Sequence, residues 1–290
     1  MKHAILIMAH TDWPALHRLV ESLDNPDIDL IIHINKKSKD WDENILDGAV
    51  RDSKIIFAPR VKVEYCNYTQ VNAICSLLKT AIKGNYDYYH LISGADLPLH
   101  PMSYFKSFFE KLPGKEFVNF EPEYDITRAY YRHFFLNTIR TSSGLKQKLF
   151  YYAYKYLIKI QKALKVNLAK GYQGSIHKGA DWWSITHRAA EYVLAQEPTF
   201  KKYFRYTYCP SELLVQTTLY NSPFRDRIYS LGNEPIAALR EIDWKRGQPY
   251  VWRTEDYEQL IASPCMFARK FDANVDSEII SKIINHIKQK

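Results

Sequence analysis

The run Ala4-Ile5-Leu6-Ile7-Met8-Ala9 decides the fold of this chain, together with His10-Thr11-Asp12 directly after it. An unbroken apolar run of this length is typical of a central parallel strand, which is buried on both faces. Thr11 or Asp12 can cap a following helix, and Pro14 suits the first turn of that helix. The sequence therefore begins with a buried β-strand that leads directly into a helix.

The same alternation of strand and helix continues through the first 120 residues. Further strands are expected at 29–34, 54–58, 88–92 and 116–120, and helices at 71–82 and 101–111. Such a series predicts an α/β fold with a Rossmann-type, mostly parallel sheet flanked by helices. Ligands of these sheets bind beyond the carboxyl ends of the strands. His10, Asn35 and Asp96 lie at such ends.

The second half of the chain is less regular. We expect a helix near 186–195, a helix that Pro210-Ser211 opens, a strand near 237–242 and a helix from 276. No repeat or clean linker divides the sequence, so a single domain over 1–290 is expected, with halves at 1–120 and 121–290 and a helical insertion at 140–170.

Charge and cysteine content narrow the class of protein. A net charge of +8 and a pI near 9.1 fit nucleic acid, an anionic membrane or a phosphorylated ligand. No helix-turn-helix, RNP-like or zinc pattern is present, so we expect no nucleic-acid partner. The cysteines at 66, 75, 209 and 265 show no CxxC spacing and are interpreted as reduced thiols. With no signal peptide and no membrane span in the sequence, they predict a cytoplasmic protein.

Residues 140–170 carry eight basic residues and no acidic one. Apolar side chains recur within them at helical spacing, at Leu145, Leu149, Tyr152, Tyr156, Ile160, Leu164 and Leu168. One interpretation is peripheral contact with an anionic membrane through 145–168. The other is a helix packed on the core with its lysines in solvent, and periodicity by itself favours this second interpretation.

Glu212 lies in the first turn of the helix that begins after Pro210. A carboxylate at this place can be an ordinary helix-capping acid, because helix amino termini favour negative charge. It can also serve as a general base that accepts a proton from a substrate. Residue type alone favours the capping acid.

Six motifs in chain order resemble one known family. They are Ala9-His10-Thr11-Asp12, Ile32-His33-Ile34-Asn35-Lys36-Lys37-Ser38, Leu91-Ile92-Ser93-Gly94-Ala95-Asp96-Leu97-Pro98-Leu99, Gly179-Ala180-Asp181-Trp182-Trp183-Ser184-Ile185-Thr186, Cys209-Pro210-Ser211-Glu212 and Phe267-Ala268-Arg269-Lys270-Phe271-Asp272. The chain resembles the core-2/I-branching β-1,6-N-acetylglucosaminyltransferases and peptide O-xylosyltransferases, glycosyltransferase family 14, as a bacterial member. The resemblance implies a GT-A-like fold, a UDP-sugar donor, inversion at the anomeric centre and no metal cofactor.

Two departures from the family pattern concern the donor. Asn35 stands where the family usually has an aspartate near the nucleotide. Tyr65-Cys66-Asn67-Tyr68-Thr69 stands where a Trp-Gly-Gly-Ser-type stretch is usual. A changed donor sugar would be one consequence of these differences.

The resemblance also assigns roles to single residues. Glu212 corresponds to the catalytic base, and Lys270 and Arg253 to the cations that meet the diphosphate, with Arg240 and Arg269 in reserve. The remaining donor-side residues are His10, Asn35 and Asp96, of which Asp96 equally fits an Asx-type turn. The acceptor-side residues are Trp182, Trp183, Glu121 and Arg128. Adjacent tryptophans on one strand point to opposite faces, so at least one of the pair is expected at the site.

Metal chemistry would normally use paired carboxylates at a strand end. Asp27-Ile28-Asp29 and Asp40-Trp41-Asp42 have that spacing, but the first precedes its strand and the second lies in a polar loop. We therefore expect fixed cations in place of a metal.

The sequence as a whole predicts an inverting, metal-independent transferase of GlcNAc or xylose from a UDP-sugar to a hydroxyl of a glycan. A lipid-linked glycan acceptor at the inner face of a plasma membrane would fit the basic segment. A non-catalytic nucleotide-sugar or glycan binder on the same fold is the alternative that the Asn35 and 65–68 departures leave open.

Overall fold

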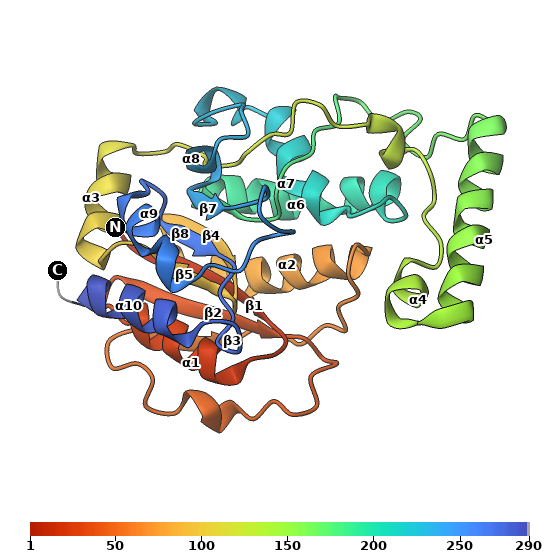
Figure 1. Ribbon diagram of the computed structural model, residues 1–290. Coiled ribbons are helices and arrows are strands. Elements are labelled where there is room, and N and C mark those ends of the chain that lie inside the picture. Colours follow the sequence, from red (N-terminus) through yellow and green to blue (C-terminus); the bar gives the residue numbers. More distant parts are fainter. Residues whose placement is uncertain (289–290) are drawn as a thin grey trace.

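The computed structural model describes residues 1–288 and has a five-stranded sheet at its centre (Figure 1). Its strands, in sheet order, are β3 (Lys54–Phe57), β2 (Ile28–Ile34), β1 (His3–Ala9), β4 (Tyr88–Ser93) and β6 (Trp183–Thr186). The first four are parallel, and β6 pairs antiparallel with β4. The apolar run in β1 occupies the middle of the sheet, where it is buried on both faces.

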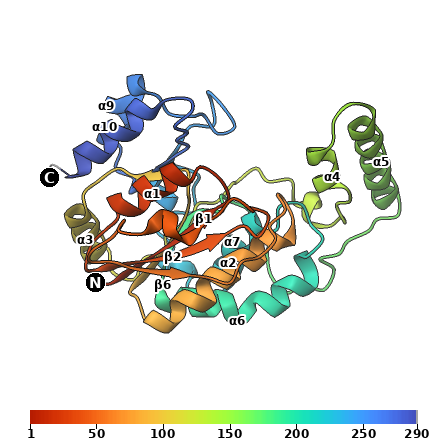
Figure 2. The ribbon, with the colours of Figure 1, turned by 90° about the horizontal axis from the view of Figure 1, so that it is seen from below.

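Helices cover both faces of this sheet (Figure 2). One core lies between the sheet and α1 (Trp13–Ser22), α3 (Met102–Lys111) and α10 (Ser277–Lys288). The other lies between the opposite face and α2 (Tyr68–Ala81), α6 (His187–Phe204) and α7 (Ser211–Tyr220). The α/β fold class predicted from the sequence is thereby confirmed.

A second, three-stranded sheet brings the C-terminal part of the chain to the end of β4. Strand β8 (Phe267–Arg269) lies between β5 (Asp96–Pro98), with which it is antiparallel, and β7 (Arg240–Ile242), with which it is parallel. Because β5 follows β4 after a short turn, the basic residues after β8 lie at the carboxyl edge of the main sheet.

Local sequence explains where the elements begin. Asp12 caps α1, with its Oδ1 accepting a hydrogen bond from the Ala15 amide at 3.2 Å, and Thr186 caps α6 in the same way. The remaining helices are α4 (Leu136–Thr141), α5 (Gly144–Ala163), α8 (Pro235–Ala238) and α9 (Tyr257–Ala262). Short 3-10 turns lie at Glu43–Leu46, Ile82–Gly84, Ile126–Ala129, Arg225–Arg227 and Thr254–Asp256.

Two predicted strands differ from the structure. Residues 116–120 form no strand, but make isolated bridges from Glu116 to Ile228 and from Phe117 to Ser184. Residues 237–242 divide between the end of α8 and the short strand β7. In both places the apolar pattern indicates burial. A buried segment can still be irregular when side chains and single bridges satisfy the hydrogen-bonding groups of its backbone.

The prediction of four reduced thiols is wrong. Cys66, just before α2, and Cys209, just before α7, form a disulfide, while Cys75 and Cys265 are free and buried. The two partners are 143 residues apart in the chain, so local spacing gives no sign of the pairing. A cytoplasmic location thereby loses the support that reduced thiols gave it.

Most of the basic segment forms α5, which together with α4 projects from one end of the molecule, away from the central sheet (Figures 1 and 2). None of the side chains of α5, a helix that is described in full, is buried. The interpretation of this segment as a helix packed on the core with only its lysines exposed is therefore wrong. Within residues 1–288, no helix combines the length and apolar character needed to cross a bilayer.

Candidate active site

Glu212 lies at the start of α7 with its side chain half-buried, 27% exposed. Helix α7 begins after Pro210, and no described side chain caps it by a hydrogen bond. The Glu212 Oε2 lies 3.3 Å from Nζ of Lys178. The carboxylate therefore faces a neighbouring cation and makes no capping bond in the described structure, which does not fit the capping role.

Lys178 is shared between two carboxylates. Besides Glu212, its ammonium pairs with Glu121, and both acids lie in segments that the sequence places far apart. Burial lowers the pKa of Lys178, but the charges of Glu212 and Glu121 outweigh it and raise the pKa above its ordinary value. Lys178 is therefore a fixed positive charge that holds Glu121 close to Glu212.

Asp181 interacts with the same carboxylate, and its Oδ1 atom is buried and makes no hydrogen bond in the described chain. Gln70 Nε2 donates a hydrogen bond to Asp181 Oδ2 at 2.6 Å, and burial raises the pKa of Asp181. Burial, and then the charge of Asp181, raise the pKa of Glu212 to about 7. A carboxylate with such a pKa accepts protons readily near neutral pH, as a general base must.

Arg269 links this cluster to the second sheet. Its guanidinium stacks on Trp182 at 4.2 Å from the ring centroid and lies 3.7 Å from Oδ1 of Asp96. Its Nε and Nη1 are buried and have no hydrogen-bond partner among residues 1–288. Buried donors of this kind are suited to an anionic ligand.

Asp96 already has protein partners. Its Oδ2 accepts from the Ser93 amide at 3.0 Å and its Oδ1 from the Ser93 hydroxyl at 2.6 Å. These bonds run back to Ser93, whereas in an Asx turn the carboxylate accepts from an amide two residues further on, and the carboxylate also faces Arg269. Its contact with a donor hydroxyl stays a prediction.

Lys270 and His10 lie near one another beyond the end of β1. The Trp252 amide donates to the Lys270 carbonyl at 3.0 Å, which brings the backbone before Arg253 next to Lys270. Partial burial and then the charge of Lys270 lower the pKa of His10. Since Asp181 interacts with Arg269, the acid cluster around Glu212 and the cations at 269–270 belong to one neighbourhood.

Arg240, a further candidate for binding the diphosphate, has a structural role. The guanidinium is buried and donates to the carbonyls of Leu91 and Trp183, each at 2.9 Å. It joins β4 to β6 and is not available to a ligand. Arg240 has the charge that a diphosphate ligand requires, but its burial between the strands keeps it from contact with a ligand.

The side chains of the two adjacent tryptophans point in different directions, as alternation along a strand requires. Trp182 stacks on Arg269, whereas Trp183 is 1% exposed in β6 and packs in the core of α2, α6 and α7. The assignment of Trp183 to the acceptor is therefore corrected.

Asn35 supports the backbone beside the site. Its Oδ1 accepts from the amides of Lys37 and Val63, and its Nδ2 donates to the Val63 carbonyl at 3.3 Å. An ionised aspartate could make only the accepting bonds. Asparagine at this position thus joins the backbone at 37 to the backbone at 63 by both accepting and donating hydrogen bonds. The departure from the family pattern therefore has a structural explanation and gives no reason to prefer a non-catalytic protein.

Aromatic and basic side chains surround the acceptor side of Glu212. Arg128 lies 4.7 Å from the ring centroid of Tyr208, and Arg140 lies 4.0 Å from that of Tyr65. The charge of Glu212 contributes to the raised pKa of Tyr65, after burial and Tyr208. Arg128 and Glu121 therefore lie near the proposed base, as the prediction for the acceptor side requires.

Sequence reasoning missed Lys178, Asp181 and Gln70. Asp181 lies inside the motif that begins at Gly179, and Lys178 directly precedes that motif, so the two charges on either side of Gly179-Ala180 were the available signal. Space for a side chain is absent at Gly179, where a Cβ would lie 2.0 Å from the Asn119 carbonyl oxygen. Gly179 thus allows the chain to pass close to 119 and present both charges. Gln70 gave no local signal.

Neither paired-carboxylate motif forms a metal site in the described structure. Asp29 accepts from Tyr86 and the Lys54 amide, and Asp40 accepts from Trp13. Residues 1–288 contain no group of three or more His, Cys, Asp or Glu side chains placed to hold a metal ion.

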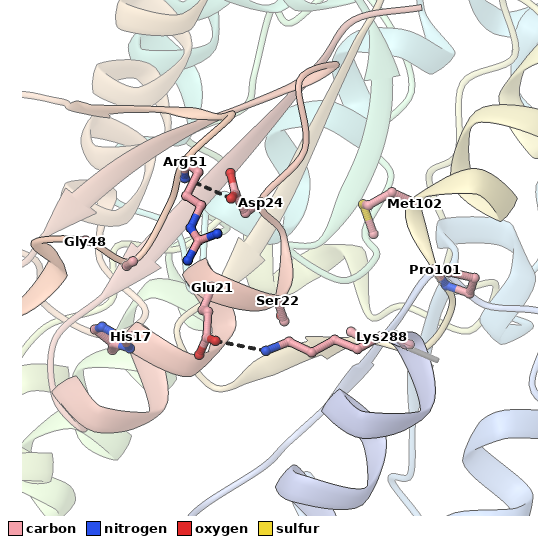
Figure 3. A pocket seen from close by; sticks show the side chains of 11 residues that line it. His17, Glu21, Ser22, Asp24, Gly48, Arg51, Pro101, Met102 and Lys288 are labelled. Carbon is pink, nitrogen blue, oxygen red and sulfur yellow. Dashed lines mark hydrogen bonds and ion pairs between the residues drawn. The ribbon is translucent and has the colours of Figure 1, made fainter. Parts of the chain in front are cut away.

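A cavity of about 510 Å³ lies elsewhere, between α1, the 48–51 loop, α3 and α10 (Figure 3). It is at the edge of the sheet opposite the carboxyl ends of the parallel strands. Glu21 is paired there with Lys288, and Asp24 accepts from the Arg51 amide. None of the predicted site residues lines it. We therefore place the candidate site at the Glu212 cluster.

Comparison with known proteins supports membership of the family that the six sequence motifs resemble. The family model described as Core-2/I-Branching enzyme matches residues 4–260. Xylosyltransferase 1 of Homo sapiens is 29% identical over 125 residues, which cover 38% of this chain and 13% of the relative, and Xylosyltransferase 2 of Rattus norvegicus is 26% identical over a stretch that covers 38% and 14%. The match thus spans only about an eighth of the length of these relatives.

Among solved structures, the apo form of mouse xyloside xylosyltransferase 1 aligns over 92% of this chain and 97% of its own, with 10% identity and a TM-score of 0.40. That similarity is too low to add to the argument, which rests on the family match over 4–260. The chain belongs to the Core-2/I-branching enzyme family.

Proposed function

We propose that the protein is an inverting glycosyltransferase that moves GlcNAc or xylose from a UDP-sugar to a hydroxyl of a glycan, with Glu212 as the general base. The observation that carries this proposal is the placement of Glu212: its half-buried carboxylate makes no capping bond with any described residue at the start of α7 and lies 3.3 Å from Nζ of Lys178. In agreement with that placement, burial and Asp181 raise the pKa of Glu212 to about 7, whereas the helix dipole alone would lower it.

The reaction needs one proton acceptor. Glu212 takes the proton of the acceptor hydroxyl as that oxygen attacks the anomeric carbon, opposite the leaving group. The bond from the anomeric carbon to the diphosphate oxygen breaks, and UDP departs with the electron pair. A new glycosidic bond of inverted configuration results.

The leaving group requires positive charge. Lys270 lies beyond β1, with the backbone before Arg253 bonded to it, and Arg269 offers two buried nitrogens that make no hydrogen bond in the described chain. Together they would stabilise the charge that develops on the diphosphate. We propose on this basis that the enzyme needs no metal ion.

Acceptor recognition falls to the groups around Lys178. Glu121 and Arg128 can hydrogen-bond sugar hydroxyls, and the Trp182 ring, stacked on Arg269, adds a face for the sugar at the site. Lys178 holds Glu121 and Glu212 at a fixed separation, so it orients the base relative to the acceptor. A glycan or lipid-linked glycan is the proposed acceptor class, with peripheral contact at a membrane.

The test has two arms. Thermal unfolding with UDP, GDP or CMP identifies the nucleotide, because a ligand of the folded state raises the midpoint. NMR of the product formed from UDP-GlcNAc or UDP-xylose, with and without EDTA, gives the anomeric configuration. Retained configuration contradicts Glu212 as the base, and loss of turnover in EDTA that Mn²⁺ restores contradicts metal independence.

A further inference from the structure

Helix α5 exposes an apolar stripe that no part of the described chain covers. Its members, here called the outer stripe, are Leu145, Leu149, Tyr152, Tyr156 and Ile160, with exposed fractions of 84%, 64%, 67%, 66% and 36%. Their spacing of three or four residues aligns them on one side of the helix. A continuous exposed apolar surface of this kind marks an interaction site.

The opposite side of α5 is fixed to the body of the protein. Tyr154 hydrogen-bonds His133 at 2.9 Å, and Gln161 exchanges two hydrogen bonds with the backbone of Arg132, at 2.8 and 3.0 Å. Phe150 contacts Phe135 at 5.1 Å between ring centroids. The helix is therefore held in one orientation, with the outer stripe directed away from these contacts.

The charge of α5 indicates what kind of surface the outer stripe binds. Lys148, Lys155, Lys159 and Lys162 are exposed and recur at helical spacing along one flank of the outer stripe. No acidic residue lies between 140 and 170. Two copies of α5 packed stripe to stripe would bring lysines together without neutralising charge, whereas an anionic surface neutralises them.

We propose that α5 docks on the surface of an anionic lipid bilayer, with the outer stripe at the boundary of headgroups and acyl chains and the lysine flank on lipid headgroups. Tyrosines suit that boundary, because the ring is apolar and the hydroxyl stays hydrated. Both views place α5 at the end of the molecule away from the C-terminus, standing clear of the sheet (Figures 1 and 2). The helix can thus lie along a flat surface without a collision with the sheet.

This inference concerns binding and does not depend on the identity of the base or the donor. Sedimentation with vesicles of phosphatidylcholine alone, or containing about one third phosphatidylglycerol, measures it directly. We expect binding only to the anionic vesicles and a marked loss in 1 M salt, where screening is strong.

Two variants test the surface. K148Q/K155Q/K159Q should lower the partition coefficient on the order of 100-fold, because each basic residue near such a surface contributes about a fivefold factor. L149S/Y152S/Y156S should lower it about 10- to 100-fold through lost apolar burial. K79Q/K83Q/K111Q, which removes three exposed lysines of the body, is the matched control and should bind as the wild type does.

Three results overturn the proposal. They are equal binding to neutral vesicles, wild-type binding by both α5 variants, and a wild-type dimer that L149S/Y152S/Y156S converts to monomer in sedimentation velocity without lipid. Circular dichroism and turnover on a soluble acceptor show whether the variants remain folded. If turnover fails in the wild type while lipid binding persists, the proposed function fails and the docking surface stands.

Discussion

Replacing Glu212 by glutamine should abolish turnover and stabilise the fold. Glutamine keeps the shape of the side chain but cannot take a proton, so we expect the turnover rate to fall about 100-fold or more. The same change removes a half-buried carboxylate whose pKa burial and Asp181 raise to about 7. A capping acid would give the opposite stability effect, because its loss costs about 1 kcal/mol.

The size of the expected gain in stability follows from the linkage between proton binding and folding. A rise of the pKa from 4.5 to about 7 means that the folded protein holds a proton that the unfolded chain releases. Wild-type stability therefore falls as pH rises between these values, and glutamine escapes that loss. At about 1.4 kcal/mol per pH unit, the variant should gain about 3 kcal/mol above pH 7 and about 1 kcal/mol at pH 5.

Denaturant unfolding at pH 5, 6, 7 and 8 measures the gain, and donor binding by calorimetry shows that the site is intact. Glu278→Gln is the matched control, because Glu278 also lies in the first turn of a helix but is 66% exposed. It should show no such pH dependence. A gain for the Glu212 variant that is equal at pH 5 and pH 8, or turnover near the wild-type rate, would refute the reasoning.

Three other variants probe the surroundings of Glu212. Lys178→Met removes a charge that lowers the pKa of Glu212, so the acidic limb of the kcat/KM profile should move to higher pH, by about one unit. Lys270→Ala should reduce kcat/KM for the UDP-sugar about 100-fold, measured by initial rates, while unfolding in denaturant stays near the wild type. Cys66→Ser with Cys209→Ser opens a loop of 143 residues and should cost about 2 to 5 kcal/mol in the free energy of unfolding, and dithiothreitol should reproduce that loss.

The sequence predicts best those elements whose apolar pattern has one structural solution. The run at 4–9 must be a central strand, and Asp12 with Pro14 starts α1 as expected. Residues 116–120 show the limit of this reasoning, because burial alone does not distinguish a strand from an irregular segment with two bridges. Helix α5 shows the same limit from the other side, since periodicity fixes the helix but not what faces its apolar side.

The candidate site was predictable where motif and residue type agree, and not where tertiary contacts decide. Asp181 interacts electrostatically with both Glu212 and Arg269, and Lys270 follows Arg269 in the chain, while their joint role at a donor site stays a prediction. Arg240 has the right charge, but it is buried and its Nη2 donates to the backbone carbonyls of Leu91 in β4 and Trp183 in β6. Such a distinction depends on contacts between segments that local sequence does not encode.

The distinction between a capping acid and a base depends on the electrostatics around Glu212. A helix amino terminus lowers the pKa of a nearby carboxyl, and so does Lys178 at 3.3 Å. The pKa nevertheless rises, because burial and Asp181 outweigh both. Folding alone would favour an amide at either position, because two neighbouring and partly buried like charges oppose it. The pair therefore costs stability and gives the protein a proton acceptor tuned to neutral pH, which a general base requires.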